Sequence, residues 1–132
     1  MNFHGYRRAD GRAGTRNLVL VIPSVGCSQS CARDIARGLK GAVGLPNILG
    51  CGQMGEDKTL VKRTLVGFGA SPNVFAVLVV GNGCEQLQPE EIAKAIAPSG
   101  KRVEVLTVQE MRGTKKTTAG GGKSRSAGYA GR

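Results

Sequence analysis

Two aliphatic segments limit the fold of this chain more than any other feature of its sequence. Residues 18–22 and 74–80 contain only Val, Leu, Ile, Ala and Phe, with no polar residue in either run. A strand with one face in water alternates apolar with polar residues, whereas a strand buried on both faces is apolar throughout. The first run therefore predicts a doubly buried strand, and the second predicts the clearest strand in the chain.

The rest of the chain up to residue 111 alternates helical segments with shorter strands. Apolar residues recur at helical spacing in residues 32–39, 60–68 and 92–96. Shorter strands are expected at 42–45 and 102–108, the latter nearer to a sheet edge. This order predicts an α/β fold with a mostly parallel sheet of about four strands. In such sheets, ligands bind beyond the carboxyl ends of the strands.

Two of the helices carry start signals. Glu56 and Asp57 precede the second helix, where carboxylates favour the positive end of the helix dipole. Pro89 stands where a first helical residue is expected before the third helix. The expected apolar face of the second helix consists of Leu60, Val61, Leu65 and Phe68.

Charge divides the chain unevenly. The formal net charge is +10, but residues 1–111 hold 13 basic and 9 acidic residues, while residues 112–132 hold 6 basic residues and no acid. The predicted organisation is an arm at 1–17, a domain at 18–111 and a basic, Gly-rich, disordered tail at 112–132. Without stacking aromatic residues beside these charges, no specific nucleic-acid binding is expected.

Neither a secretory leader nor a membrane span is evident. The first residues are polar, and the longest apolar runs are much shorter than a bilayer requires. We therefore expect a cytoplasmic setting without a membrane partner, in which cysteines are more often reduced, metal-bound or catalytic than paired in disulfides.

Three cysteines each follow a predicted strand. Cys27, Cys51 and Cys84 lie in Gly-containing loops that a parallel sheet places along one edge. Three thiolates there would suit iron or an iron–sulfur cluster with an open position, whereas zinc is less attractive because His4 is the sole histidine. The alternative is that they are small core residues and the glycines serve turns. Cys31, inside the first helix, is expected to pack in the core.

The arm before the first strand is rich in arginine. Residues 5–17 carry four arginines and no core-forming pattern. Guanidinium groups bind carboxylates in a bidentate manner, so the arm could clamp an acidic ligand. The alternative is a solvated arm without a ligand.

Several short motifs occur in a fixed order. They are Gly5-Tyr6-Arg7, Asp10-Gly11-Arg12, Gly14-Thr15-Arg16-Asn17, Gly50-Cys51-Gly52-Gln53, Gly55-Glu56-Asp57, Pro72-Asn73-Val74, Gly83-Cys84-Glu85, Leu87-Gln88-Pro89, Val108-Gln109-Glu110 and Gly113-Thr114-Lys115-Lys116-Thr117. Their order over residues 3–118 resembles the altronate/galactarate dehydratase family, which also includes sulfolactate sulfo-lyase large subunits.

The resemblance implies a Rossmann-like three-layer fold and a hydro-lyase that acts on sugar acids such as altronate or galactarate. The product would be a 2-keto-3-deoxy acid, and the cofactor would be iron (Fe²⁺ or an iron–sulfur cluster) or another divalent metal. The implied site has metal ligands Cys27, Cys51 and Cys84, substrate-binding residues Arg12, Arg16, Asn17 and Gln53, and acid–base residues Glu85 and Asp10.

The chain departs from the family pattern at three places. Asn47 stands where the family often has a histidine, and an amide is neither a general base nor a good transition-metal ligand. Arg112 replaces a usual glycine, which should crowd a turn. After Thr118 the resemblance ends, so we expect a segment of an enzyme that needs a small SAF-type subunit or a further C-terminal domain, and a homo-oligomer when complete. The alternative function is a non-catalytic sugar-acid-binding module or an oligomerisation remnant of that family.

Overall fold

The computed structural model describes residues 1–113 and 115. Its elements are β1 (Tyr6–Arg7), β2 (Ala13–Gly14), β3 (Leu18–Pro23), η1 (Gly26–Ser28), α1 (Gln29–Arg37), β4 (Ala42–Gly44), α2 (Gly55–Gly69), β5 (Val74–Gly81), α3 (Pro89–Ile96), η2 (Ala97–Ser99) and β6 (Arg102–Thr107). The predicted α/β class is confirmed.

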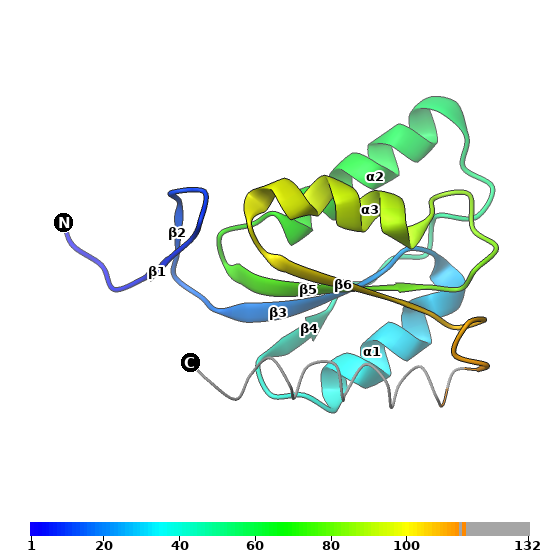
Figure 1. Cartoon of the computed structure of the whole chain (residues 1–132), viewed down its shortest axis with the longest axis horizontal. Coiled ribbons are helices and arrows are strands. Elements are labelled where there is room, and N and C mark those ends of the chain that lie inside the picture. Colours follow the sequence, from blue (N-terminus) through cyan, green and yellow to red (C-terminus); the bar gives the residue numbers. More distant parts are fainter. Residues whose placement is uncertain (114, 116–132) are drawn as a thin grey trace.

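A four-stranded parallel sheet forms the centre of the molecule, in the order β4-β3-β5-β6 (Figure 1). The two aliphatic runs became the two inner strands, β3 and β5, which pair from Leu18↔Val74 to Pro23↔Val80. β6 lies at one edge, as its sequence predicts, and β4 lies at the other.

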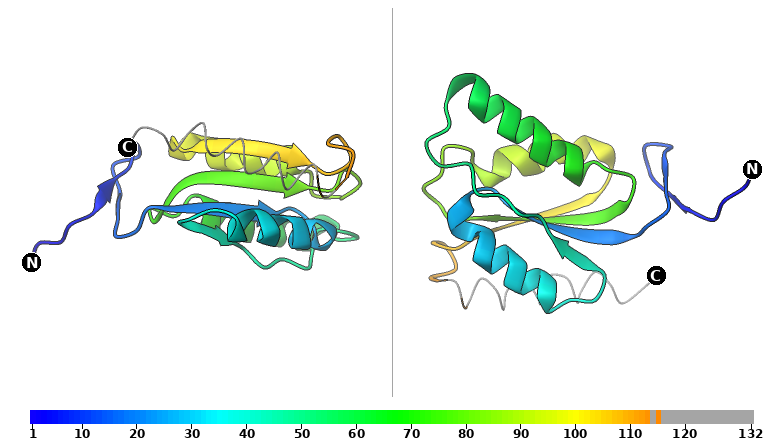
Figure 2. Two further views of the ribbon diagram at one scale, coloured as in Figure 1. Left: turned by 90° about the horizontal axis from the view of Figure 1, so that it is seen from below. Right: turned by 180° about the vertical axis from the view of Figure 1, so that it is seen from behind.

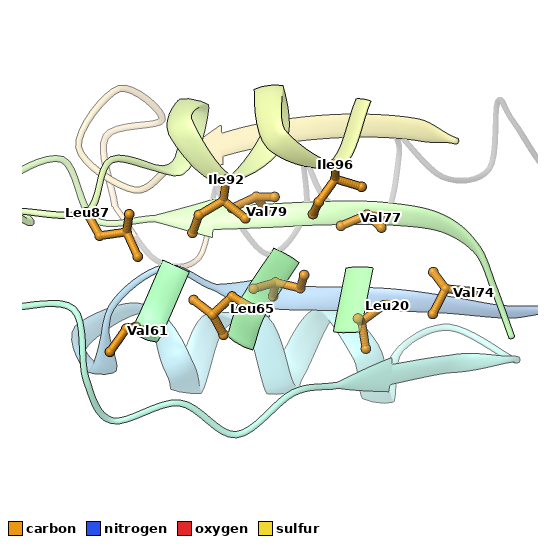
Figure 3. Packing of buried hydrophobic residues seen from close by; sticks show 10 residues of the cluster. Leu20, Val61, Leu65, Val74, Val77, Val79, Leu87, Ile92 and Ile96 are labelled. Carbon is orange, nitrogen blue, oxygen red and sulfur yellow. The ribbon is translucent and has the colours of Figure 1, made fainter. Parts of the chain in front are cut away.

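The pleat of the inner strands separates two apolar cores. One lies between the sheet and helices α2 and α3 (Figure 3) and consists of Leu20, Ile22, Val61, Leu65, Val74, Val77, Val79, Leu87, Ile92 and Ile96. The other lies beneath α1 and consists of Val21, Cys31, Ala32, Ile35, Ala36, Leu78 and Val80. Because successive strand residues point to opposite faces, both inner strands are buried on both sides. The result is the expected three-layer arrangement, with α2 and α3 on one face and α1 on the other (Figures 1 and 2).

Local signals at the helix starts agree with the structure. Glu56 and Asp57 lie in the first turn of α2, and Pro89 is the first residue of α3. The predicted apolar face of α2 was right for two of its four residues and wrong for the other two. Val61 and Leu65 are buried, but Leu60 and Phe68 are 62% and 51% exposed, because α2 turns only one narrow stripe toward the sheet and α3.

Arg112 lies in the turn that follows β6. Arg112 adopts a φ of 58°, a left-handed conformation that glycine tolerates better than any side chain. The usual glycine would therefore fit this position better than arginine, and Gly113 closes the turn by donating to Val108 O at 3.0 Å. Most of the predicted disordered tail, residues 114 and 116–132, lies outside the described residues. Among the helices of residues 1–113 and 115, none is long and apolar enough to cross a bilayer.

Two leucines of α2 test this packing. Leu65→Ala should lower the free energy of unfolding by about 2–5 kcal/mol, because it removes a side chain that is only 4% exposed and leaves a cavity. Leu60→Ala, the matched control on the same helix, should change it by no more than about 0.5 kcal/mol. Urea unfolding followed by circular dichroism measures both. Equal losses would show that Leu60 also packs against the protein.

Candidate functional site

The loops that carry the three exposed cysteines are direct neighbours at the carboxyl edge of the sheet. Gly26 N donates to Leu49 O at 3.0 Å, which joins the Cys27 loop to the Cys51 loop. Ser24 N donates to Val80 O at 3.0 Å, which joins the Cys27 loop to the strand that leads into the Cys84 loop. The Cys27 loop therefore lies between the other two, as the strand order β4-β3-β5 requires.

Glycine allows two of these loops to approach so closely. A Cβ on Gly26 would lie 2.9 Å from Ile48 O. Gly50 has a φ of +107°, and a Cβ there would lie 3.0 Å from Val25 Cα. Any side chain at either position would push the Cys27 and Cys51 loops apart.

The cysteines take the positions that the sequence predicts, but their thiols are not assembled as a metal site. Cys27, Cys51 and Cys84 are exposed, whereas Cys31 is buried in the core beneath α1, as expected. Cys84 Sγ accepts a hydrogen bond from Asn82 Nδ2 at 3.2 Å. Within residues 1–113 and 115, no group of three His, Cys, Asp or Glu side chains is close enough to hold a metal ion. The three-cysteine metal site stays a prediction.

Glu85 organises the loop that contains Cys84. Its side chain is buried, with the residue 2% exposed, and accepts hydrogen bonds from Ser24 Oγ at 2.6 Å, Gly83 N at 2.6 Å and Asn82 N at 3.0 Å. Burial raises the pKa of this carboxyl, but the hydrogen bonds from Ser24 and the backbone outweigh burial and bring the pKa below its usual range. An ionised Glu85 thus holds the Asn82–Cys84 turn against the Cys27 loop. The sequence signalled Glu85 but gave no sign that Ser24 would be its partner.

Amide side chains hold the Cys51 loop in a similar way. Asn47 is buried, donates to Pro23 O at 2.9 Å and accepts from Leu49 N at 3.1 Å. Gln53 Oε1 accepts from Gly50 N at 2.6 Å. Gln53, expected to bind substrate, and Asn47, noted as a departure from the family pattern, therefore both use polar atoms to fix the backbone around Cys51.

The arm that carries the other predicted site residues lies at the opposite end of the strands, the amino edge of the sheet (Figure 1). Its strands β1 and β2 form an antiparallel pair before β3. Arg12 is paired with Asp10 at 2.7 Å and donates to Ala70 O at the end of α2 at 2.6 Å. Asn17 Oδ1 accepts from Arg8 Nη1 at 2.9 Å.

Arg16 is held in place by its backbone. Its N–H donates to Asn73 Oδ1 at 3.2 Å, and Asn73 also accepts from Thr15 N at 2.9 Å. The guanidinium of Arg16 has no partner among the described residues. The Gly-Thr-Arg-Asn motif therefore docks the arm on the turn before β5, and Arg16 remains exposed.

The predicted site residues consequently form two groups rather than one. β3 runs from the arm to the Cys27 loop over six residues, which separates the two edges by about 20 Å. A small acid held at the cysteines would not reach Asp10, Arg12, Arg16 or Asn17 of the same chain. The expectation of one shared site is thus corrected by the length of the strand between the two groups.

Comparisons with known proteins identify the family of the chain. Residues 5–129 match the family model described as D-galactarate dehydratase/Altronate hydrolase, second domain, so the similarity continues past Thr118, where the motifs predicted that it ends. The chain is 40% identical over 108 residues to the (2R)-sulfolactate sulfo-lyase subunit beta of Chromohalobacter salexigens, which covers 82% of this chain and 27% of that protein. No solved structure matches the chain.

Two altronate dehydratases are also similar. The Escherichia coli protein is 38% identical over 93 residues, covering 63% of this chain and 19% of that protein. The Bacillus subtilis protein is 32% identical over 120 residues, covering 83% of this chain and 24% of that protein. The chain thus spans about a fifth to a quarter of the length of these relatives.

Replacement of the buried carboxylate tests its structural role. Glu85→Gln should lower the free energy of unfolding by about 1–3 kcal/mol, because an amide NH₂ would face backbone N–H donors that now meet a carboxylate. Chemical denaturation in a chelating buffer measures the loss. Glu90→Gln is the control. It replaces an exposed carboxylate in the same part of the chain and should have little effect on the free energy of unfolding. Comparable losses in both variants would contradict the assignment.

Acid should remove the same contribution. Because the pKa of Glu85 is lower in the folded than in the unfolded chain, its stabilisation is present above a pH of about 4.5 and is lost as pH falls through the folded pKa. The stability difference between the unmodified protein and Glu85→Gln should therefore shrink as pH falls from about 5 toward about 2. A difference that stays constant over this range would exclude an ionised Glu85.

Proposed function

The chain belongs to the D-galactarate dehydratase/altronate hydrolase second-domain family, and we propose from this membership that it supplies the carboxyl-edge part of a lyase active site. One observation carries the proposal: three exposed thiols stand on three adjoining loops, at the edge where parallel α/β sheets bind ligands. The arm at the other edge is left out of the proposed site.

The proposed substrate is a hydroxylated sugar acid. Relatives are named for altronate and for (2R)-sulfolactate, and both names denote carboxylates. The proposed reaction removes the proton α to the carboxylate and expels the β-hydroxyl, and the resulting enol becomes a 2-keto-3-deoxy acid. Such a reaction needs a group that stabilises negative charge on the substrate's carboxylate as the α-proton leaves.

A divalent metal, most suitably iron, would meet this need. When bound, it would act as a Lewis acid that binds substrate oxygens and assists hydroxide departure. Cys27, Cys51 and Cys84 fit the group by donor chemistry and by placement on adjacent loops. Their thiols are exposed and separate in the described residues, so binding requires the loops to move inward.

Glu85 acts in this proposal by positioning rather than by proton transfer. Its carboxylate accepts hydrogen bonds from Ser24 and loop amides, and its pKa lies below the usual range. A base for the α-proton must have a free lone pair near the substrate. We therefore assign Glu85 to holding Cys84 in place, and expect the base to come from another part of the assembled enzyme.

We further propose that turnover requires additional protein. The chain spans about a quarter of the length of the sulfo-lyase relative, which is itself named as a subunit. The additional part would be a further domain or a companion subunit, and it would cover the exposed thiols and supply substrate specificity.

Metal binding can be tested on the chain by itself. The protein, purified without oxygen, is titrated with Co²⁺, whose thiolate charge-transfer absorption reports sulfur ligation independently of activity. Cys27→Ser, Cys51→Ser and Cys84→Ser should each weaken binding by about tenfold or more, since even outer contacts of metal sites contribute that much. Cys31→Ala is the control and should retain the absorption, because Cys31 lies in the core.

The result also separates the two candidate functions. Absence of thiolate absorption, or three serine variants that bind as the unmodified protein does, would overturn the metal proposal. Sugar-acid binding without any metal would then favour the alternative, a binding module that does not catalyse.

A further inference from the structure

A basic cleft lies at the amino edge of the sheet, away from the cysteines. Its volume is 410 Å³, and it is lined by Arg7, Arg8, Ala9, Phe75, Ser99, Gly100, Lys101 and Arg102. The arm forms one wall, and the turn between η2 and β6 forms another. Gly100 allows the two walls to meet, since a Cβ there would lie 2.7 Å from Ala9 Cβ.

The basic side chains around this cleft exceed the acidic ones. Arg12 is paired with Asp10, and Arg102 is paired with Glu104 at 2.5 Å. Within the described residues, the ion pairs leave Arg7, Arg8 and Lys101 without a carboxylate. The cleft therefore retains a local excess of positive charge.

Hydrogen bonds hold Arg8 and Lys101 without neutralising them. Arg8 donates to Pro72 O at 2.6 Å and to Arg16 O at 3.0 Å. Lys101 Nζ donates to Gly69 O at 3.1 Å and to Ser71 O, at the carboxyl end of α2. Carbonyl oxygens supply only partial negative charge. Arg8 and Lys101 are thus fixed in position while most of their charge remains available to a ligand.

Burial and, to a smaller extent, this excess of positive charge disfavour the ammonium form of Lys101. Burial lowers its pKa to about 8, and the neighbouring charges of Arg12 and Arg8 act in the same direction against the weaker opposing effect of Asp10. A group in this setting gains from an incoming anion, because the anion offsets the repulsion from both arginines.

We propose that this cleft binds a small oxyanion with two or more negative charges. Its volume falls within the range of small-molecule sites and is too small for a folded partner. Phe75 and Ala9 add apolar surface beside the cations, which suits a compact organic acid. The site is separate from the proposed metal site, from which the length of β3 divides it.

The test is calorimetric titration of the full chain with citrate and, separately, with pyrophosphate, at low ionic strength. One of them should bind with a stoichiometry of one, and the better ligand assigns the site to carboxylates or to phosphates. Lys101→Met should weaken binding by about tenfold, the loss expected for one charge-assisted hydrogen bond. Arg7→Gln should weaken it by about threefold, because Arg7 is more exposed.

Arg63→Gln is the matched control, since it removes one charge from the exposed side of α2, outside the cleft. It should leave the affinity unchanged. Arg7→Gln keeps the test decisive if Lys101→Met fails to fold, because no hydrogen bond or ion pair of the Arg7 side chain exists in the described residues. Failure of both anions to bind, or equal losses in Arg63→Gln and Arg7→Gln, would overturn the proposal. Displacement of either anion by a short oligonucleotide that binds more tightly would do the same.

The pH dependence provides an independent readout. The charged groups that act on Lys101 are Arg8, Arg12 and Asp10 of the arm. Arg102 of β6 lines the same cleft and is paired with Glu104. An anion in the cleft should raise the pKa of Lys101 above about 8. Affinity should therefore fall as pH rises from about 8 to about 10, and this fall should be absent in Lys101→Met. A fall of the same size in Lys101→Met would overturn the assignment to Lys101.

Discussion

The parallel pairing of β3 and β5 is the interaction on which the rest of this structure depends. Both strands are apolar on both faces, so neither can reach its buried state without cover from two layers of helices. Parallel pairing also places the ends of both strands at the same edge. The loops with Cys27 and Cys84 become neighbours for this reason, and the arm meets the turn before β5 at the other edge.

The loops at the carboxyl ends of the strands stabilise a buried anion, whereas the segments at the amino ends hold a group of cations. At the carboxyl edge, the buried Glu85 carboxylate accepts backbone N–H groups and a serine hydroxyl, which stabilise its ionised form. At the amino edge, Arg12 and Lys101 donate to carbonyls at the end of α2, where cations are favoured by the helix dipole. Glu85 has a full set of donors, whereas Lys101 is crowded by like charges. That difference explains why one group fixes a loop and the other favours an incoming anion.

The positions of the strands and helices along the chain could be predicted because their signals are local. The runs at 18–22 and 74–80, the acidic start of α2 and Pro89 of α3 each determine their neighbours' conformation over a few residues. The face of α2 could not be predicted with the same success, since Leu60 is as apolar as Leu65 and only contacts with the sheet and α3 distinguish them. The contacts that the arm makes could not be predicted either. Arg12 and Asn17 have the chemistry of ligand-binding residues, but contacts with Asp10 and Arg8 of the arm itself, and with Ala70 at the end of α2, occupy them.

The sequence by itself determined the parallel α/β sheet, the family and the placement of three cysteines after three strands, because hydrophobic pattern and motif order are written along the chain. The tertiary structure decided which other residues they contact. It placed the arm about 20 Å from the cysteines, the length of a six-residue strand. It also joined Ser24 to Glu85 and brought Lys101 beside Arg8 and Arg12. These contacts join residues that are dozens of positions apart in the sequence. A local sequence pattern does not encode them, because only folding brings such segments together.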